Sequence, residues 1–198
     1  MGARSLVVGE ALVDIVKESS GETREHVGGS PLNVAVGLAR LDHRVTLATH
    51  FGRDAHGAAI GEHLAEAGVD LVPGSDRAAD TSVATATLDE SGAATYDFDI
   101  DWRLPALPQV PGHVHTGSIG ALLRPGCVDV LSAMSGAART HTVSYDPNCR
   151  PQLMGDPAQE TTQVGFEGAL YLQHPEPGQV IEVKHIEKLS GCPRSFSV

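Results

Sequence analysis

The sequence predicts an α/β fold in which a mainly parallel sheet is covered by helices on both faces. Short apolar runs of strand length alternate with stretches in which apolar residues recur at helical spacing. One Thr-rich region instead alternates apolar and polar residues, as a hairpin does. Alternating strands and helices join through right-handed crossovers, which make neighbouring strands parallel. The 198 residues are 41% hydrophobic and 20% charged, which excludes a disordered or fibrous chain.

The first unit is a strand, a second strand-like segment, a turn and a helix. The apolar run at 6–8 predicts a buried strand, and residues 11–16 continue as a strand interrupted by Asp14. After a polar turn, Ser30 is expected to cap a buried helix over 32–41, with Pro31 at its first position.

The second unit repeats this pattern. A strand is expected over 45–50, a helix over 55–67 and a strand over 69–72. Gly68 follows the last helical residue and is expected to end that helix in the left-handed conformation.

The next part of the chain has a different residue pattern. Residues 82–89 and 93–100 predict a β-hairpin, because both alternate and a Glu-Ser-Gly turn joins them. Beyond a Pro-rich loop, a strand is expected over 114–119, a helix over 127–138 and a strand over 142–145. Ligands of parallel α/β sheets bind beyond the carboxyl ends of the strands, so polar residues that follow strands are site candidates.

Two candidate groups lie near the start of the chain. Gly28 and Gly29 would let the backbone approach a ligand, and Asn33, one helical turn further on, could offer an amide to a hydroxyl. The alternative is a plain tight turn. Asp14 could accept hydrogen bonds from sugar hydroxyls within its strand, or could face water at an exposed edge.

A third candidate group follows the strand at 142–145. Asp146, Asn148 and Arg150 place an acid, an amide and a guanidinium within five residues, a set that suits polar ligands and phosphate. The alternative is an ordinary turn formed by the Asp-Pro pair.

No metal centre is expected. His56 and His63 lie about 10 Å apart along their helix, at 1.5 Å of rise per residue, which is too far for one ion. His113 and His115 lie on one side of a strand, without the partners of known zinc patterns, and we expect them to be solvated. The absence of GxGxxG, GxxxxGK[ST] and GxSxG disfavours a Rossmann dehydrogenase, a Walker-type NTPase and an α/β hydrolase.

Charge and composition bear on partners. The formal net charge of −11 disfavours binding to nucleic acid or anionic membrane through the overall field. No apolar run approaches twenty residues and the start lacks a signal-peptide pattern, so we expect a cytoplasmic protein. The three cysteines, Cys127, Cys149 and Cys192, are widely spaced and are expected to be reduced thiols.

Several segments together resemble a known family. They appear in order along the chain from about Ser5 to Pro157, and they are Val8-Gly9-Glu10-Ala11-Leu12-Val13-Asp14, Gly28-Gly29-Ser30-Pro31-Leu32-Asn33-Val34-Ala35, Gly52-Arg53-Asp54-Ala55-His56-Gly57, Thr116-Gly117-Ser118 and Asp146-Pro147-Asn148-Cys149-Arg150. On these residues the chain resembles the PfkB-type, ribokinase-like carbohydrate kinases, and within them the fructokinase-like members.

The resemblance implies a ribokinase-like parallel sheet flanked by helices, with a small β-lid at about 14–26 and 82–99 that closes over the sugar. It implies that Asp14 and Asn33 bind sugar hydroxyls beside the glycine turn. It further implies that Phe98 reaches the sugar from the lid and that Arg150 reaches the polar end of the substrate. ATP and Mg²⁺ are the implied cofactors, a sugar is the implied ligand, and a homodimer through the lid is implied.

The chain also departs from the family pattern. The family's catalytic Gly-Ala-Gly-Asp segment, whose Asp deprotonates the sugar hydroxyl, occurs nowhere in the sequence, and neither does its Asn-x-x-Glu segment. We therefore expect a family region over 1–158, a divergent tail over 159–198 with one strand-like stretch at 180–186, and no catalytic residue in this chain. The first hypothesis is an incomplete kinase for fructose or a keto-sugar acid. The alternatives are a sugar-binding or dimerisation module without catalysis, and a fragment without function.

Overall fold

The structure, a computed structural model, describes residues 4–89, 91–108, 112–146 and 148, with the backbone of 168–173 and 180–186. It confirms the predicted α/β class. A five-stranded sheet has the order β5-β4-β1-β8-β9, and all its paired strands are parallel. Its strands are β1 (Arg4–Val8), β4 (Arg44–Ala48), β5 (Asp70–Leu71), β8 (Gly112–Gly117) and β9 (Thr142–Asp146).

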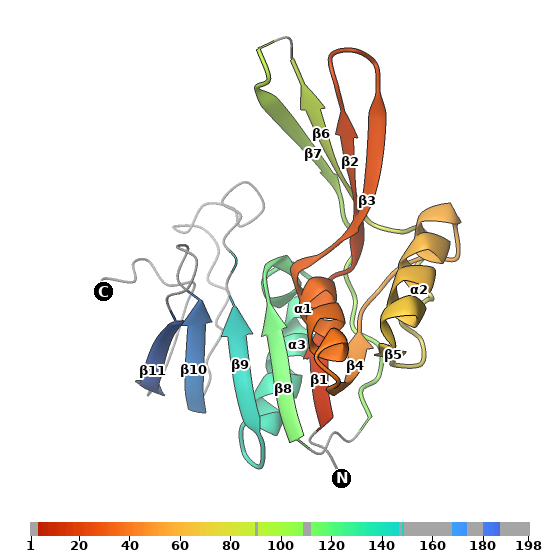
Figure 1. Ribbon diagram of the computed structural model, residues 1–198. Helices are drawn as coiled ribbons and strands as arrows, with labels where there is room; N and C mark the ends of the chain where they lie inside the picture. Colours follow the sequence, from red (N-terminus) through yellow and green to blue (C-terminus); the bar gives the residue numbers. More distant parts are fainter. Residues whose placement is uncertain are drawn as a thin grey trace.

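Helices cover both faces of this sheet. Successive residues of a strand point to opposite faces, so the apolar strands give each face side chains that pack against helices. They are α1 (Ser30–Arg40), α2 (Ala55–Ala67) and α3 (Gly126–Ala137), and a short 3-10 helix, η1 (Ile119–Ala121), follows β8. Val7 of β1 packs in one core with Leu32 of α1 and Ile60 of α2. Leu6 and Val8 pack in a second core with residues of α3 and with Trp102. Figure 1 shows α1 and α2 in front of the sheet and α3 behind it.

A second, four-stranded sheet stands beyond the carboxyl ends of the main strands (Figure 1). Its order is β3-β2-β6-β7, formed by β2 (Leu12–Lys17), β3 (Thr23–Gly28), β6 (Val83–Leu88) and β7 (Ala94–Asp99). Two antiparallel hairpins, β2–β3 and β6–β7, join through a parallel pairing of β2 with β6. The lid predicted at 14–26 and 82–99 is therefore present as one sheet.

Local signals explain most element boundaries. The carboxylate of Asp54 accepts a hydrogen bond of 2.8 Å from the N–H of Gly57 and so caps α2, and Gly68 ends the helix at φ +76°, as predicted. The start of α1 differs from the prediction. Gly29 takes the capping position with φ +110°, a backbone conformation that favours glycine, and Ser30 is already the first helical residue.

Beyond β9, β10 (Gly168–Gln173) and β11 (Val180–Ile186) form an antiparallel pair. The sequence predicted the strand at 180–186 and missed the one at 168–173. The predicted boundary at residue 158 lies outside the described residues and stays a prediction.

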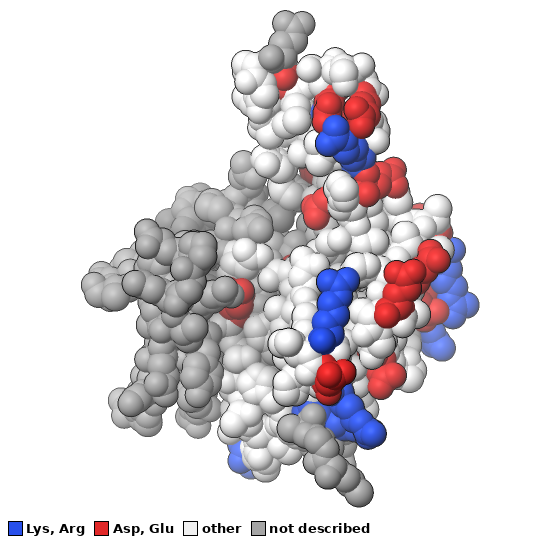
Figure 2. Space-filling model, in the orientation of Figure 1, with Lys and Arg blue, Asp and Glu red and all other residues white. Residues whose placement is uncertain are grey.

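Within the described part, no helix is both long and apolar enough to cross a membrane. Figure 2 shows acidic and basic side chains interspersed over the face it presents, without a continuous basic surface among the described residues. At the tip of the β2–β3 hairpin, for example, Arg24 pairs with Glu18 at 2.8 Å and with Glu22 at 2.9 Å.

Candidate functional site

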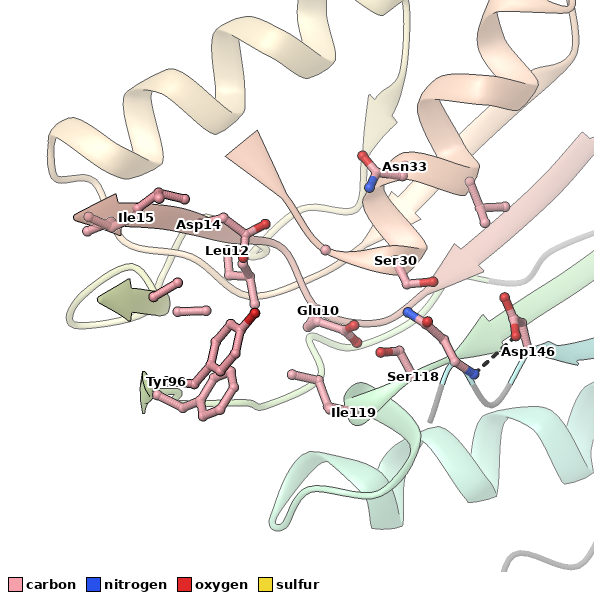
Figure 3. A pocket seen from close by; sticks show the side chains of 17 residues that line it. Glu10, Leu12, Asp14, Ile15, Ser30, Asn33, Tyr96, Ser118, Ile119 and Asp146 are labelled. Carbon is pink, nitrogen blue, oxygen red and sulfur yellow. Dashed lines mark hydrogen bonds between the residues drawn. The ribbon is translucent and has the colours of Figure 1, made fainter. Parts of the chain in front are cut away.

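A cleft of about 840 Å³ lies between the lid and the carboxyl ends of the main strands. This is the edge at which ligands of parallel α/β sheets bind, and the volume is within the roughly 300–1,000 Å³ of small-molecule sites. Polar lining residues come from the β1–β2 loop, β2, α1, the segment after β8 and the end of β9 (Figure 3). They are Glu10, Asp14, Ser30, Asn33, Ser118, Asp146 and Asn148.

Asp14 lies on β2, opposite His26 of β3 and Ala84 of β6. It is exposed, and it lines the cleft from a strand that is central in the lid sheet. The edge-strand alternative is therefore wrong, because β2 has a partner on each side. Gly28 does not line the cleft itself. A Cβ atom at Gly28 would collide with the Asp14 carboxylate, so this glycine leaves room for the acid.

Gly29 and Asn33 form the wall at the start of α1. A Cβ atom at Gly29 would lie 2.5 Å from the carbonyl oxygen of Glu10, so the close approach of these two segments requires glycine. The N–H of Asn33 donates to the carbonyl of Gly29 at 2.9 Å, and its exposed side chain faces the cleft. The glycine turn thus brings an amide to the cleft beside a helix start.

Two aromatic side chains of β7 form the lid side of the cleft. Phe98 was predicted there, and Tyr96, two residues earlier on the same strand face, lies with it. Their rings stack with centroids 6.1 Å apart and planes 8° apart. Tyr96 is 51% exposed, so a large apolar face is available to a ligand.

Asp146 and Asn148 reach the cleft from the end of β9. The backbone N–H of Asn148 donates to Oδ1 of Asp146 at 3.1 Å, the dashed line in Figure 3, and Asn148 adopts φ +34°. Both residues line the cleft, and the Asp146 carboxylate accepts a hydrogen bond from the backbone two residues further on. Their role towards a polar ligand or phosphate stays a prediction. Arg150 lies outside the described residues and stays a prediction.

Glu10 is a site residue that sequence reasoning missed. Its side chain lies on the cleft floor and is 4% exposed. Burial raises its pKa to about 7, against the lowering effect of hydrogen bonds from its own N–H, the N–H groups of Gly120 and Ser30, and the Ser118 side chain. Its place after the first strand, within the family segment Val8-Gly9-Glu10-Ala11-Leu12-Val13-Asp14, was the signal that could have drawn attention to it. Ser30, Ser118 and Tyr96 were also given no ligand role in advance.

The histidine prediction needs a correction. His113 and His115 do lie on one side of β8, but both are partly buried. Nε2 of His113 and Nδ1 of His115 lie 2.7 Å and 2.8 Å from Oγ of Ser144 on the neighbouring strand, so these rings are not simply solvated. No group of three or more His, Cys, Asp or Glu side chains in the described part could hold a metal ion. Cys127 is a buried free thiol, and the other two cysteines lie outside the described residues.

Comparison with known proteins finds fructokinases that are similar to this chain. A fructokinase of Salmonella typhimurium is 33% identical over 168 residues, and one of Escherichia coli is 31% identical over 166 residues. These alignments cover 80% and 79% of this chain but only 55% and 54% of the relatives, so the chain spans about half the length of the curated relatives it matches.

Solved structures of sugar kinases share the fold of this chain. The apo fructokinase of Vibrio cholerae matches with a TM-score of 0.67 and 27% identity, covering 79% of this chain and 57% of that one. A ribokinase of Cryptococcus neoformans in complex with ADP matches with a TM-score of 0.61 and 22% identity, covering 80% and 52%. The ribokinase-like class is thereby confirmed.

The decisive match is to a family model. The model of the pfkB family carbohydrate kinases matches residues 3–172, which includes the whole lid and every predicted site residue. This chain therefore belongs to the pfkB family of carbohydrate kinases.

Proposed function

We propose that this chain binds a neutral ketose, with fructose as the leading candidate, in the cleft between the lid and the main sheet. The observation that carries the proposal is the convergence of Asp14, Asn33, Phe98, Asp146 and Asn148, which come from four separate segments of the chain, on one cleft. Fructokinases among the relatives support the choice of sugar.

The chemistry of the lining suits a polyhydroxylated ligand. Asp14 can accept hydrogen bonds from two adjacent hydroxyls, and Asn33 can both donate and accept. The stacked rings of Tyr96 and Phe98 offer an apolar surface to the C–H face of a sugar.

The charge of the described lining residues supports one of the two substrate classes expected from the sequence. Among the described lining residues, three carboxyl groups face the cleft and no Lys, Arg or His does. A keto-sugar acid would bring a further negative charge to this acidic surface, so the described residues favour a neutral sugar.

Calorimetry tests this proposal. Fructose should bind the purified chain, and Asp14→Ala and Asn33→Ala should each remove measurable binding, while Asp70→Ala, at an exposed position on β5, should not. Ribose and 2-keto-3-deoxygluconate complete the panel. Absence of binding by the intact chain, or binding that survives Asp14→Ala, would contradict the proposed site.

Phosphoryl transfer from ATP to the sugar is the activity that family membership implies. A fructokinase of Xylella fastidiosa, a 24% identical structural match, was crystallised with bound ATP. The described residues of this chain form no cluster suited to Mg²⁺, so we assign no metal ligand and no step to the metal. Because the sequence contains no Gly-Ala-Gly-Asp segment, we propose that this chain does not transfer phosphoryl groups by itself. An ADP-release assay with fructose and MgATP should show no turnover, and ordinary kinase turnover would overturn this part.

A homodimer through the lid remains a second proposal. The lid sheet has β3 and β7 as its edges, and most of their residues are exposed. Edge strands offer unpaired backbone groups to another chain. Light scattering coupled to size exclusion should give twice the mass of 20.7 kDa, and a mass of one chain would contradict it.

A further inference from the structure

The floor of the cleft contains a buried carboxyl group, that of Glu10, which makes none of the proposed contacts with the sugar. Glu10 lies in the loop between β1 and β2 and is 4% exposed, although its side chain borders the cleft. A carboxyl group in such a place costs free energy unless polar partners satisfy it. Its partners therefore indicate what it does.

Those partners come from two other segments. Oε2 of Glu10 accepts a hydrogen bond of 2.8 Å from the N–H of Gly120, 110 positions further along the chain. The N–H of Ser30, at the start of α1, and the side chain of Ser118 also hydrogen bond to this carboxyl. One side chain thus joins the β1–β2 loop, the start of α1 and the segment after β8, and Figure 3 shows it pointing between Ser30 and Ser118.

The segment after β8 needs such support. Ser118 has φ +55°, a conformation that non-glycine residues adopt only when their surroundings hold them there. Its N–H donates to the carbonyl of Asp146 at 2.8 Å, and Nε1 of Trp102 donates to the carbonyl of Gly120 at 2.7 Å. Gly120 is therefore held at its carbonyl by Trp102 and at its N–H by Glu10.

We propose that Glu10 is a positioning residue for the sugar site, whose ionised carboxyl fixes the start of α1 and the segment after β8 at the spacing that binding requires. This proposal rests on the proposed function. Glu10 acts through Ser30, Ser118 and Gly120 and does not itself contact the sugar.

The positioning role requires the ionised form of Glu10. The donors from Gly120, Ser30 and Ser118 match a carboxylate, whereas a protonated carboxyl gives up part of its acceptor capacity. Burial raises the pKa of Glu10 to about 7, so the group changes its charge near neutral pH. The other ionisable groups of the described lining are Asp14 of β2, Tyr96 of β7 and Asp146 of β9.

Calorimetric titration with fructose between pH 5.5 and 8.5 tests the proposal. The affinity of the unaltered chain should fall as the pH drops through about 7. Glu10→Gln should bind fructose about tenfold more weakly at pH 8 and show no such pH dependence, because loss of one hydrogen bond to a charged group corresponds to about this factor. Glu66→Gln, the same substitution at an exposed position on α2, should behave as the unaltered chain.

A second readout needs no ligand. Trp102 is the single tryptophan and donates to the carbonyl of Gly120, so its fluorescence emission reports on the hydrogen bonds between Glu10 and the segment after β8. The free chain should show an emission change with a midpoint near pH 7 that Glu10→Gln abolishes.

The outcomes separate the two proposals. If fructose binds with the same affinity and pH dependence in Glu10→Gln and the unaltered chain, the positioning role is overturned and the proposed function stands. If the unaltered chain binds no fructose at any pH, the proposed function fails and the positioning role with it, whatever Trp102 reports.

Discussion

The stability of Glu10→Gln relative to the unaltered chain should increase as the pH rises through neutrality, even though the substitution weakens the site. A carboxyl whose pKa rises on folding binds its proton more tightly in the native state, so stability is lost as pH rises from the unfolded to the folded pKa. For Glu10 these values are 4.5 and about 7. The cost of keeping the buried group ionised above pH 7 is therefore about 3 kcal/mol, at 1.36 kcal/mol per pKa unit.

The quantity to measure is the difference in free energy of unfolding between Glu10→Gln and the unaltered chain. Groups that titrate alike in both proteins cancel in this difference. Between pH 5.5 and 8.5 the difference should shift by about 2 kcal/mol in favour of Glu10→Gln. The loss of hydrogen bonds by the Gln side chain adds an offset that does not change with pH.

Urea unfolding at several pH values, followed by circular dichroism, gives these free energies. Glu66→Gln, at an exposed position on α2, is the matched control for replacing a carboxyl group by an amide. A flat difference for Glu10→Gln would refute the reasoning, because it would mean that the buried carboxyl titrates at its ordinary pKa.

Three further predictions concern the lid, α2 and the sheet. Tyr96→Ala should weaken fructose binding about tenfold in calorimetry, because it removes half of the stacked pair at 6.1 Å, while Tyr96→Phe should bind as the unaltered chain; equal binding by all three would argue against stacking. Asp54→Ala should lower the free energy of unfolding by about 2 kcal/mol. The reason is that this carboxylate caps α2 and also accepts hydrogen bonds of 2.7 Å and 2.8 Å from the N–H and the hydroxyl of Thr81. Asp70→Ala is the exposed control. A loss no greater than that of the control would contradict this role. The ring of His115 should stay neutral down to about pH 5 in NMR titration, because burial, and next the charge of His113, lower its pKa to about 4; a midpoint near 6.5 would show that the ring is solvated.

Local sequence signals predicted the elements whose causes are local. The end of α2 at Gly68 and the β6–β7 hairpin follow from residues that lie within a few positions of one another. The β2–β3 hairpin was expected only from the family resemblance, and the cap of α2 at Asp54 was not predicted. The pairing of β2 with β6, which unites the hairpins into one lid sheet, joins distant segments and carries no local signal. That pairing is also what makes Asp14 a central-strand residue and leaves the edge positions to β3 and β7.

The site shows the same division. Asp14, Asn33, Phe98, Asp146 and Asn148 lie in family motifs or beside strand ends, so the sequence could nominate them, and the structure brings them to one cleft. Glu10 could not be nominated with a role, because its partner amide at Gly120 is 110 positions away. Ser30 was expected as a cap, but Gly29 takes that position, where φ is +110° and the carbonyl oxygen of Glu10 leaves no room for a Cβ atom.

The central claim is that the cleft beneath the lid binds a sugar, and mapping the binding site of fructose by NMR tests it most directly. In a ¹⁵N-labelled chain, fructose should shift the backbone amide signals of Gly29, Asn33 and Ser118, and leave that of His141, at the opposite end of the sheet, unchanged. Asp14→Ala should remove these shifts. Shifts confined to other surfaces, or equal shifts in Asp14→Ala, would contradict the account.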